Sequence, residues 1–236
     1  MYKVLIIINA QQVSSEGTIL STSPATQRMA AALKDTIVTE TKEETVVKTI
    51  AAHQLLHQTT WYNPDDSEWI CCPLTIELPP QFDFPRAKLF QTCRNIKKVR
   101  QWVEQNLNLK TGNQIRKVWH GNYWLPIVFT PKGPLYGEVI GETQIPNIYH
   151  QPIPFPDHKR QSLYRLGYQL LDSLSAQAGV YLLQFGFQEE TLIFDRVWPF
   201  PAAPALASLG VQKPNLYACY WQCLIQKPIR DLVISY

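Results

Sequence analysis

The sequence has 236 residues, of which 45% are hydrophobic and 17% are charged, and its formal net charge is +3 at pH 7. A chain of this length and composition can bury a substantial core, which excludes a disordered tail and a fibrous repeat. Its apolar runs are far shorter than the ~20 residues that a membrane-spanning helix needs, so we expect no membrane insertion.

The cysteines and the first residues indicate the expected compartment. The chain has five cysteines, an odd number whose spacing suggests no disulfide framework, so we expect free thiols in a reducing environment. Residues 1–8 read directly into a strand and lack the pattern of a secretory signal peptide. These observations predict a cytoplasmic location.

The first half of the chain predicts an α/β subdomain. Residues 4–9 form an apolar strand, and a helix begins at Pro24, a residue type favoured in the first helical turn. The apolar spacing over residues 43–58 predicts a second helix, and residues 69–78 alternate as a strand. Residues 86–108 carry apolar side chains every three or four positions, which predicts one long helix.

The second half is denser in aromatic and β-branched residues. We expect strands over residues 118–123, 124–129 and 135–140, a helix over 159–177, a hairpin of strands 180–187 and 191–197, and a last helix over 215–226. The polar stretch 108–113 separates the two halves. The prediction is therefore an α/β or α+β protein with two subdomains, residues 1–112 and 113–236, the second with antiparallel strands and flanking helices.

Three segments of the second half resemble a known family. Residues 179–186 read GVYLLQFG, residues 192–201 read LIFDRVWPFP, and the last helix ends at Lys227-Pro228-Ile229. Their order resembles the C-terminal part of the ATP-grasp superfamily, in which a Gly-Val-type strand precedes a strand that ends in an acidic-x-Asn-Pro-like metal motif. The resemblance implies Mg²⁺ held by oxygen ligands, which neutralises ATP phosphates during attack by a carboxylate.

The ligand positions depart from that pattern. Gln184 stands where the family offers an acid, and Val197 stands two residues after Asp195, where an Asn is expected. The resemblance leaves four residues as a nucleotide or metal remnant, namely Gln184, Asp195, Arg196 and Lys132. We therefore expect no catalytic residue, no metal site and no bound cofactor, although weak binding of ATP with Mg²⁺ is compatible with this remnant.

Positive charge is concentrated in one segment. Residues 86–117 contain nine basic residues and one acid, Glu104. Arg94, Lys97, Lys98 and Arg100 are the expected contacts for an anionic partner, most simply a protein with an acidic surface. Nucleic acid is a weaker prediction because only Phe90 and Trp102 could stack with bases there. The alternative is an ordinary solvated helix face.

Two further side-chain pairs have ligand-like spacing. His53 and His57 lie four residues apart, a spacing that suits zinc, but no third ligand is nearby in the sequence. Cys219 and Cys223 have the same spacing within an apolar helix. Packing is the favoured interpretation of both pairs.

The sequence thus favours a non-catalytic accessory, assembly or regulatory protein, a pseudoenzyme built on a reduced ATP-grasp-like fold. Two alternatives stay open. One is an active ATP-dependent carboxylate–amine ligase, in which Asp195 and a displaced Glu would hold the metal and Lys132 or Arg196 would contact phosphate or substrate. The other is an RNA-binding protein that uses the basic segment.

Overall fold

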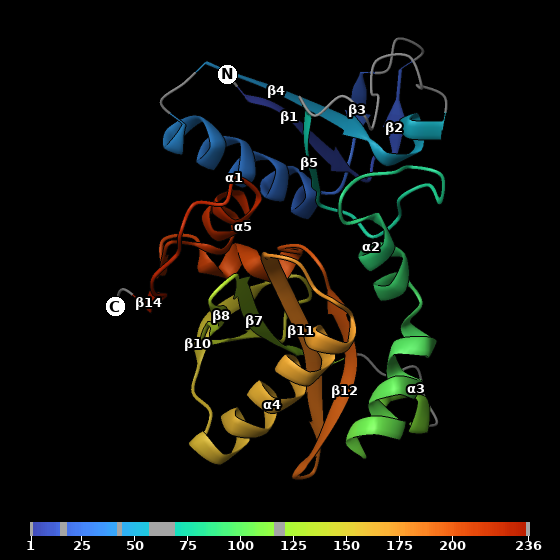
Figure 1. Cartoon of the computed structure of the whole chain (residues 1–236), viewed down its shortest axis with the longest axis vertical. Helices are drawn as coiled ribbons and strands as arrows, with labels where there is room; N and C mark the ends of the chain where they lie inside the picture. The colour runs from blue at the N-terminus through green and yellow to red at the C-terminus, as the bar shows by residue number, and fades with distance from the viewer. Residues whose placement is uncertain (1, 15–17, 42–43, 57–68, 116–120, 235–236) are drawn as a thin grey trace.

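The computed structural model describes residues 2–14, 18–41, 44–56, 69–115 and 121–234, and places two sheets one above the other in the view of Figure 1. The upper sheet is parallel, with β1 (Tyr2–Ile8) between β4 (Thr45–Ala51) and β5 (Trp69–Pro73). Residues 4–8 of β1 are all buried, as a central parallel strand requires. A short hairpin, β2 (Gln12–Val13) with β3 (Ile19–Ser21), follows β1.

The helix predicted to begin at Pro24 is confirmed as α1 (Pro24–Glu40). The Ser23 side chain accepts a hydrogen bond from the Thr26 backbone N–H at 3.2 Å, which caps the first turn. Met29, Leu33 and Ile37 form its buried stripe. This stripe holds α1 against the rest of the core.

The helix predicted over residues 43–58 is wrong. The segment forms β4 and then a 3₁₀ turn, η1 (Ala52–Leu56). Val46, Val47 and Ile50 are β-branched, and β4 pairs in parallel with all seven residues of β1. His53 lies exposed on η1, and His57 lies outside the described residues.

The long helix predicted over residues 86–108 is two helices, α2 (Ala87–Arg94) and α3 (Ile96–Leu107). Asn95 separates them, and its side chain accepts the Lys98 backbone N–H at 3.1 Å. Both helices keep the predicted apolar face, with Leu89 and Val103 buried. The break therefore changes the direction of the chain without exposing the apolar stripe.

The lower sheet is mainly antiparallel and confirms the predicted hairpin. Its strands follow the order β10-β9-β7-β11-β12-β6, and β8 also pairs with β7. They are β6 (Lys110–Thr111), β7 (Tyr123–Thr130), β8 (Gly133–Tyr136), β9 (Val139–Glu142), β10 (Tyr149–Ile153), β11 (Gly179–Gln188) and β12 (Thr191–Trp198). The strand predicted over residues 135–140 is thus two strands, divided at Gly137, and most of the one predicted over 118–123 lies outside the described residues.

Helices cover both faces of the lower sheet and divide the core in two. On one face, α4 (Asp157–Ser173) and α3 pack on Leu183, Phe185 and Phe194. On the other, α5 (Leu216–Leu224), preceded by the 3₁₀ turn η3 (Ala203–Ser208), lies between this sheet and α1, as Figure 1 shows. A last short pair, β13 (Gln212–Lys213) with β14 (Val233–Ile234), ends the described chain.

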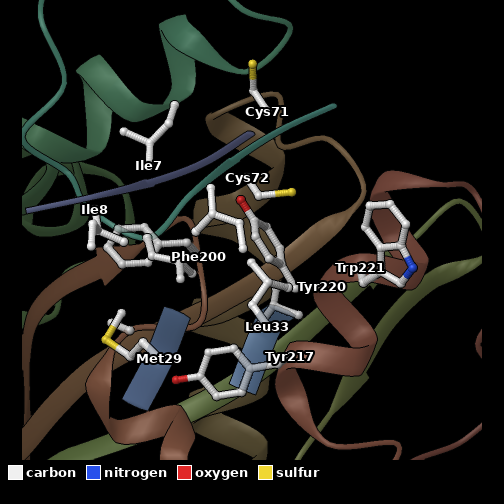
Figure 2. Close-up of a cluster of buried hydrophobic side chains, with 14 of the residues drawn as sticks. Ile7, Ile8, Met29, Leu33, Cys71, Cys72, Phe200, Tyr217, Tyr220 and Trp221 are labelled. Carbon is white, nitrogen blue, oxygen red and sulfur yellow. The ribbon is translucent and has the colours of Figure 1, made fainter. Parts of the chain in front are cut away.

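The core on the α5 side of the lower sheet joins the two halves of the chain. Figure 2 shows Tyr217, Tyr220 and Trp221 of α5 among residues of the parallel sheet and of α1. The Tyr220 hydroxyl donates to the Pro73 carbonyl oxygen at 3.3 Å, across 147 positions in sequence. The predicted boundary at residue 112 stays a prediction, but this core contains residues from both sides of it.

All five cysteines are buried and none of them forms a disulfide, in agreement with the expected thiols. Cys72 is drawn within the core in Figure 2.

Among the helices of the described chain, none combines the length and apolar character needed to cross a membrane.

Candidate functional site

A cleft of about 490 Å³ opens where the two sheets meet. The segments just after β1 and β5 line one side, and β7, β9, β10, β11 and β12 line the other. The carboxyl end of a parallel sheet is a common place for ligands because several strands end there together. The described lining residues are Asn9, Met29, Leu74, Thr75, Ile76, Glu77, Trp124, Glu142, Tyr149, Gln184, Trp198, Phe200, Ala202, Ala203 and Pro204.

Two polar side chains fix the parallel-sheet side of the cleft. The Thr75 hydroxyl donates to Asn9 Oδ1 at 2.8 Å and accepts the Glu77 backbone N–H at 3.0 Å. Asn9 directly follows β1, and Thr75 follows β5. The hydrogen bond between them therefore ties the ends of two neighbouring strands together at the mouth of the site.

Aromatic rings form much of the opposite side. Trp124 packs edge-on against Tyr149 with ring centroids 5.3 Å apart, and Trp198 packs edge-on against Phe200 at 5.9 Å. Such rings offer flat apolar surface, and their faces attract cations. The cleft is therefore suited to an organic ligand with a planar or positively charged part.

The only charged residues among the described lining are two carboxylates. Glu77 pairs with Arg94 at 2.7 Å, so its charge is already balanced. Glu142 accepts the Asn147 backbone N–H at 2.8 Å. Burial, together with the charge of Glu142, raises the pKa of Tyr149 to about 12, so this phenol stays neutral and can donate. The cleft favours a neutral or cationic ligand group over phosphate.

A hydrogen-bonded chain begins at the cleft and runs into the lower sheet. The Trp198 indole N–H donates to Gln184 Oε1 at 3.0 Å, and Gln184 Nε2 donates to the Gly121 carbonyl at 2.6 Å. A Cβ at Gly121 would collide with the backbone of Phe185, so the close approach requires glycine. Gln184 thus has both ends of its amide occupied.

The same series of hydrogen bonds continues to Asp195, which does not line the cleft. The Gly121 backbone N–H donates to Asp195 Oδ2 at 3.1 Å. Arg100 of α3 donates its Nε to the Asp195 carbonyl at 2.8 Å and forms an ion pair with its carboxylate. The Asp195 side chain is fully buried. Its carboxylate therefore stabilises the contact between β12 and α3.

The four residues of the predicted nucleotide or metal remnant lie in different places. Gln184 lies in the cleft wall and opposes Arg196 in the β11–β12 register, while the Arg196 guanidinium lies 5.4 Å from the Trp198 ring centroid. Asp195 is buried behind them. Lys132 lies exposed in the β7–β8 turn and lines a separate cavity with Cys223 and Lys227. Val197 stands where the family motif would place a metal ligand, and it is buried in the core that the lower sheet forms with α3 and α4.

Oxygen ligands for a metal are sparse in this arrangement. No group of three or more His, Cys, Asp or Glu residues that could hold a metal ion occurs within the described ranges. Glu77, Glu142 and Gln184 line the cleft and offer the kind of oxygen that magnesium prefers, but Glu77 is already paired with Arg94. Gln184 Oε1, however, already accepts the Trp198 N–H.

The basic segment lies outside the cleft. Lys97 and Lys98 are exposed at the start of α3, whereas Arg94 reaches Glu77 and the Leu78 carbonyl. Arg100 is committed to Asp195, with only 13% of its side chain exposed. Contact of these four residues with an anionic partner stays a prediction, and Arg100 has a structural role in addition.

Sequence reasoning did not identify Glu142, Tyr149 or Trp124 as site residues. They come from β9, β10 and β7, and the sheet brings them next to the loop that follows β5. Trp198 offers a partial signal because it stands beside a Pro directly after the predicted strand 191–197. Taken alone, the many tryptophans of the sequence suggest no more than a general partner surface.

Comparisons with known proteins show which solved structures have a similar architecture. No protein-family model and no curated protein matches the sequence. Three similar solved structures illustrate the result. The N5-carboxyaminoimidazole ribonucleotide synthetase from Thermus thermophilus matches with a TM-score of 0.68 at 9% identity, over 97% of this chain and 79% of that one. The glycinamide-RNase-transformylase T from Mycobacterium tuberculosis matches at 0.64 and 13% identity, over 98% and 81%.

The third is the L-amino acid ligase from Bacillus licheniformis, with a TM-score of 0.59 at 11% identity, over 98% of this chain and 75% of that one. All three have the ATP-grasp fold. The chain therefore has an ATP-grasp-like fold, and the resemblance predicted for the C-terminal half extends over nearly its whole length.

Proposed function

We propose that this protein is an ATP-dependent carboxylate–amine ligase whose cleft binds the amine substrate. The carrying observation is Glu142, a carboxylate that lines a 490 Å³ cleft with no described basic side chain in its wall. A fold shared over 97–98% of the chain with a ribonucleotide synthetase and an L-amino acid ligase supports the reaction class.

Recognition of the amine follows from the cleft wall. An ammonium group beside Glu142 would form a charge-assisted hydrogen bond, and the rings of Trp198 and Tyr149 would lie against its organic part. Asn9 and Thr75 would complete a polar edge on the opposite side. Gln184 is too strongly engaged to act as a base, so its role would be to hold Trp198 in position.

Binding of the amine can be tested without knowledge of the second substrate. A panel of primary amines and amino acids is titrated by calorimetry into the wild type and into Glu142→Gln. A charge-assisted bond contributes about 1.5–3 kcal/mol, so the affinity of a bound amine should fall at least about tenfold in the variant. Glu189→Gln, an exposed change on the β11–β12 turn, is the matched control and should leave affinity unchanged.

The second candidate function is a ligand-binding protein without catalysis. The observation that favours it is the engagement of Gln184 by Trp198 and Gly121, with Asp195 bound to Arg100 behind the cleft. These contacts leave few free oxygens for Mg²⁺, which a ligase needs to neutralise ATP phosphates. Amine binding without any Mg²⁺-dependent release of ADP would establish this candidate instead.

A further inference from the structure

A buried arginine, Arg86, lies outside the lining of the cleft. It is 5% exposed. Its Nη2 donates to the Pro199 carbonyl at 2.9 Å, while Nε and Nη1 have no hydrogen-bond partner. The guanidinium carbon lies 5.5–5.7 Å from the ring centroids of Phe90, Tyr181 and Tyr220.

No carboxylate in the described part of the chain pairs with Arg86. An arginine is rarely buried unless it is paired, because removal of its charge from water is costly. Three aromatic rings and one carbonyl recover part of that cost. Two N–H-bearing nitrogens nevertheless remain unsatisfied, which is uncommon for a buried polar group and requires a reason.

Arg86 also lines a cavity of about 360 Å³ that has no lining residue in common with the cleft. Its other described lining residues are Trp69, Ile70, Cys71, Phe84, Pro85, Gln177, Ala178, Cys223, Leu224 and Gln226. Most of these are apolar, and no acid is among them. The cavity therefore combines one uncompensated cation with an apolar wall and two amide side chains.

We propose that this cavity is a second binding site, for a small carboxylate with an apolar body. The carboxylate would enter beside Arg86, displace the side chains that cover the buried Nε and Nη1, and accept their hydrogen bonds, so supplying the missing counter-charge. The apolar body would lie against Trp69, Ile70 and Leu224, and the amides of Gln177 and Gln226 stand at the polar part of the wall. Inorganic phosphate would satisfy the charge but would leave the apolar wall uncovered.

Benzoate is the probe, and benzamide, which has the same shape without the charge, is its control. At constant ionic strength, benzoate should raise the melting temperature of the full chain in a saturable way, whereas benzamide and phosphate should have little effect. Nitrogen NMR of the arginine side chains should show the Arg86 Nε–H resonance shift with benzoate. Stabilisation by phosphate equal to that by benzoate would overturn the carboxylate assignment.

Two variants locate the effect. Arg86→Met keeps the apolar stem and should abolish the benzoate response. Because loss of Arg86 could prevent folding, Gln226→Glu provides an independent test, since it places a negative charge in the cavity wall at an exposed position and should weaken benzoate binding at least tenfold. Gln105→Glu adds the same charge on the exposed face of α3 and should bind benzoate as the wild type does. Equal binding by the two glutamate variants would refute the site.

Discussion

At the scale of single residues, Asp195 is the acid that the sequence suggests for a nucleotide or metal site. In the structure it forms a buried pair with Arg100 and holds β12 against α3 instead. A bulge in the β11–β12 ladder between Gln184 and Phe185 shifts the register there. Strict alternation along the strand therefore cannot tell which side Asp195 faces. The sequence indicated an acid near the site, but only the fold shows that its carboxylate binds α3.

Removal of this carboxylate should destabilise the protein strongly. Asp195→Ala leaves Arg100 without its buried partner, and breaking such a pair costs about 3–5 kcal/mol. Chemical denaturation measures the free energy of unfolding. Glu77→Gln, which breaks the half-exposed pair with Arg94, is the control and should cost less than about 1 kcal/mol. Equal losses in the two variants would show that burial does not distinguish these pairs.

The buried thiols predict how stability depends on pH. Burial raises the pKa of Cys93 to about 12 and that of Cys223 to about 11, against an ordinary value of 9.0. The thiolate is thus favoured only in the unfolded chain, so the thiols contribute full stability below pH 9 and lose it as the pH rises toward 12.

Urea denaturation at pH 7, 8 and 10.5 measures this loss. The midpoint should be similar at pH 7 and 8 and should be lower at pH 10.5. Thiol titration of the unfolded chain without reductant should find five groups, as the free cysteines require. A midpoint that stays constant to pH 10.5 would contradict the burial of these two thiols.

At the scale of elements, the spacing of apolar residues predicted which side of a segment is buried better than it predicted where helices and strands begin and end. Residues 86–108 have the apolar stripe of one helix, yet Asn95 interrupts it because its side chain competes for the backbone N–H of Lys98. Residues 43–58 also have helical spacing, but their β-branched residues pair with β1. That pairing depends on a strand more than 35 residues away, which local periodicity cannot report.

The cap at Asn95 should contribute measurably to stability. Asn95→Ala removes the acceptor for the Lys98 N–H, and loss of such a cap costs about 1 kcal/mol. Gln105→Ala, on the exposed face of the same helix, should change the free energy of unfolding by less than about 0.5 kcal/mol. If Asn95→Ala is equally neutral, the break between α2 and α3 is maintained by packing alone.

At the scale of the whole molecule, the cleft could not be predicted from local patterns. Asn9 and Thr75 come from the end of the parallel sheet, whereas Glu142 and Trp198 come from strands of the other sheet. Only the stacking of the two sheets brings these four residues together. The β11–β12 hairpin can be recognised in the sequence because its two strands are adjacent in the chain. The ATP-grasp resemblance that rests on this hairpin predicts the fold family but does not predict the other strands and helices.

The arrangement also explains why the basic segment and the cleft are separate features. Lys97 and Lys98 lie on α3, which packs on the face of the lower sheet opposite to α5. The Arg100–Asp195–Gly121–Gln184 chain of contacts connects that face with Trp198 in the cleft wall. This connection crosses the sheet through residues that are largely buried.

The central claim is tested most directly by ADP release in the presence of Mg²⁺ and ATP, with the amine that binds best and a panel of carboxylates. We predict release that requires both substrates and Mg²⁺, with a KM for the amine that rises at least tenfold in Glu142→Gln and is unchanged in Glu189→Gln. The Asp195→Ala variant is unsuitable as a control because loss of the buried pair with Arg100 destabilises the fold itself. Amine binding with no ADP release for any carboxylate would contradict the ligase account.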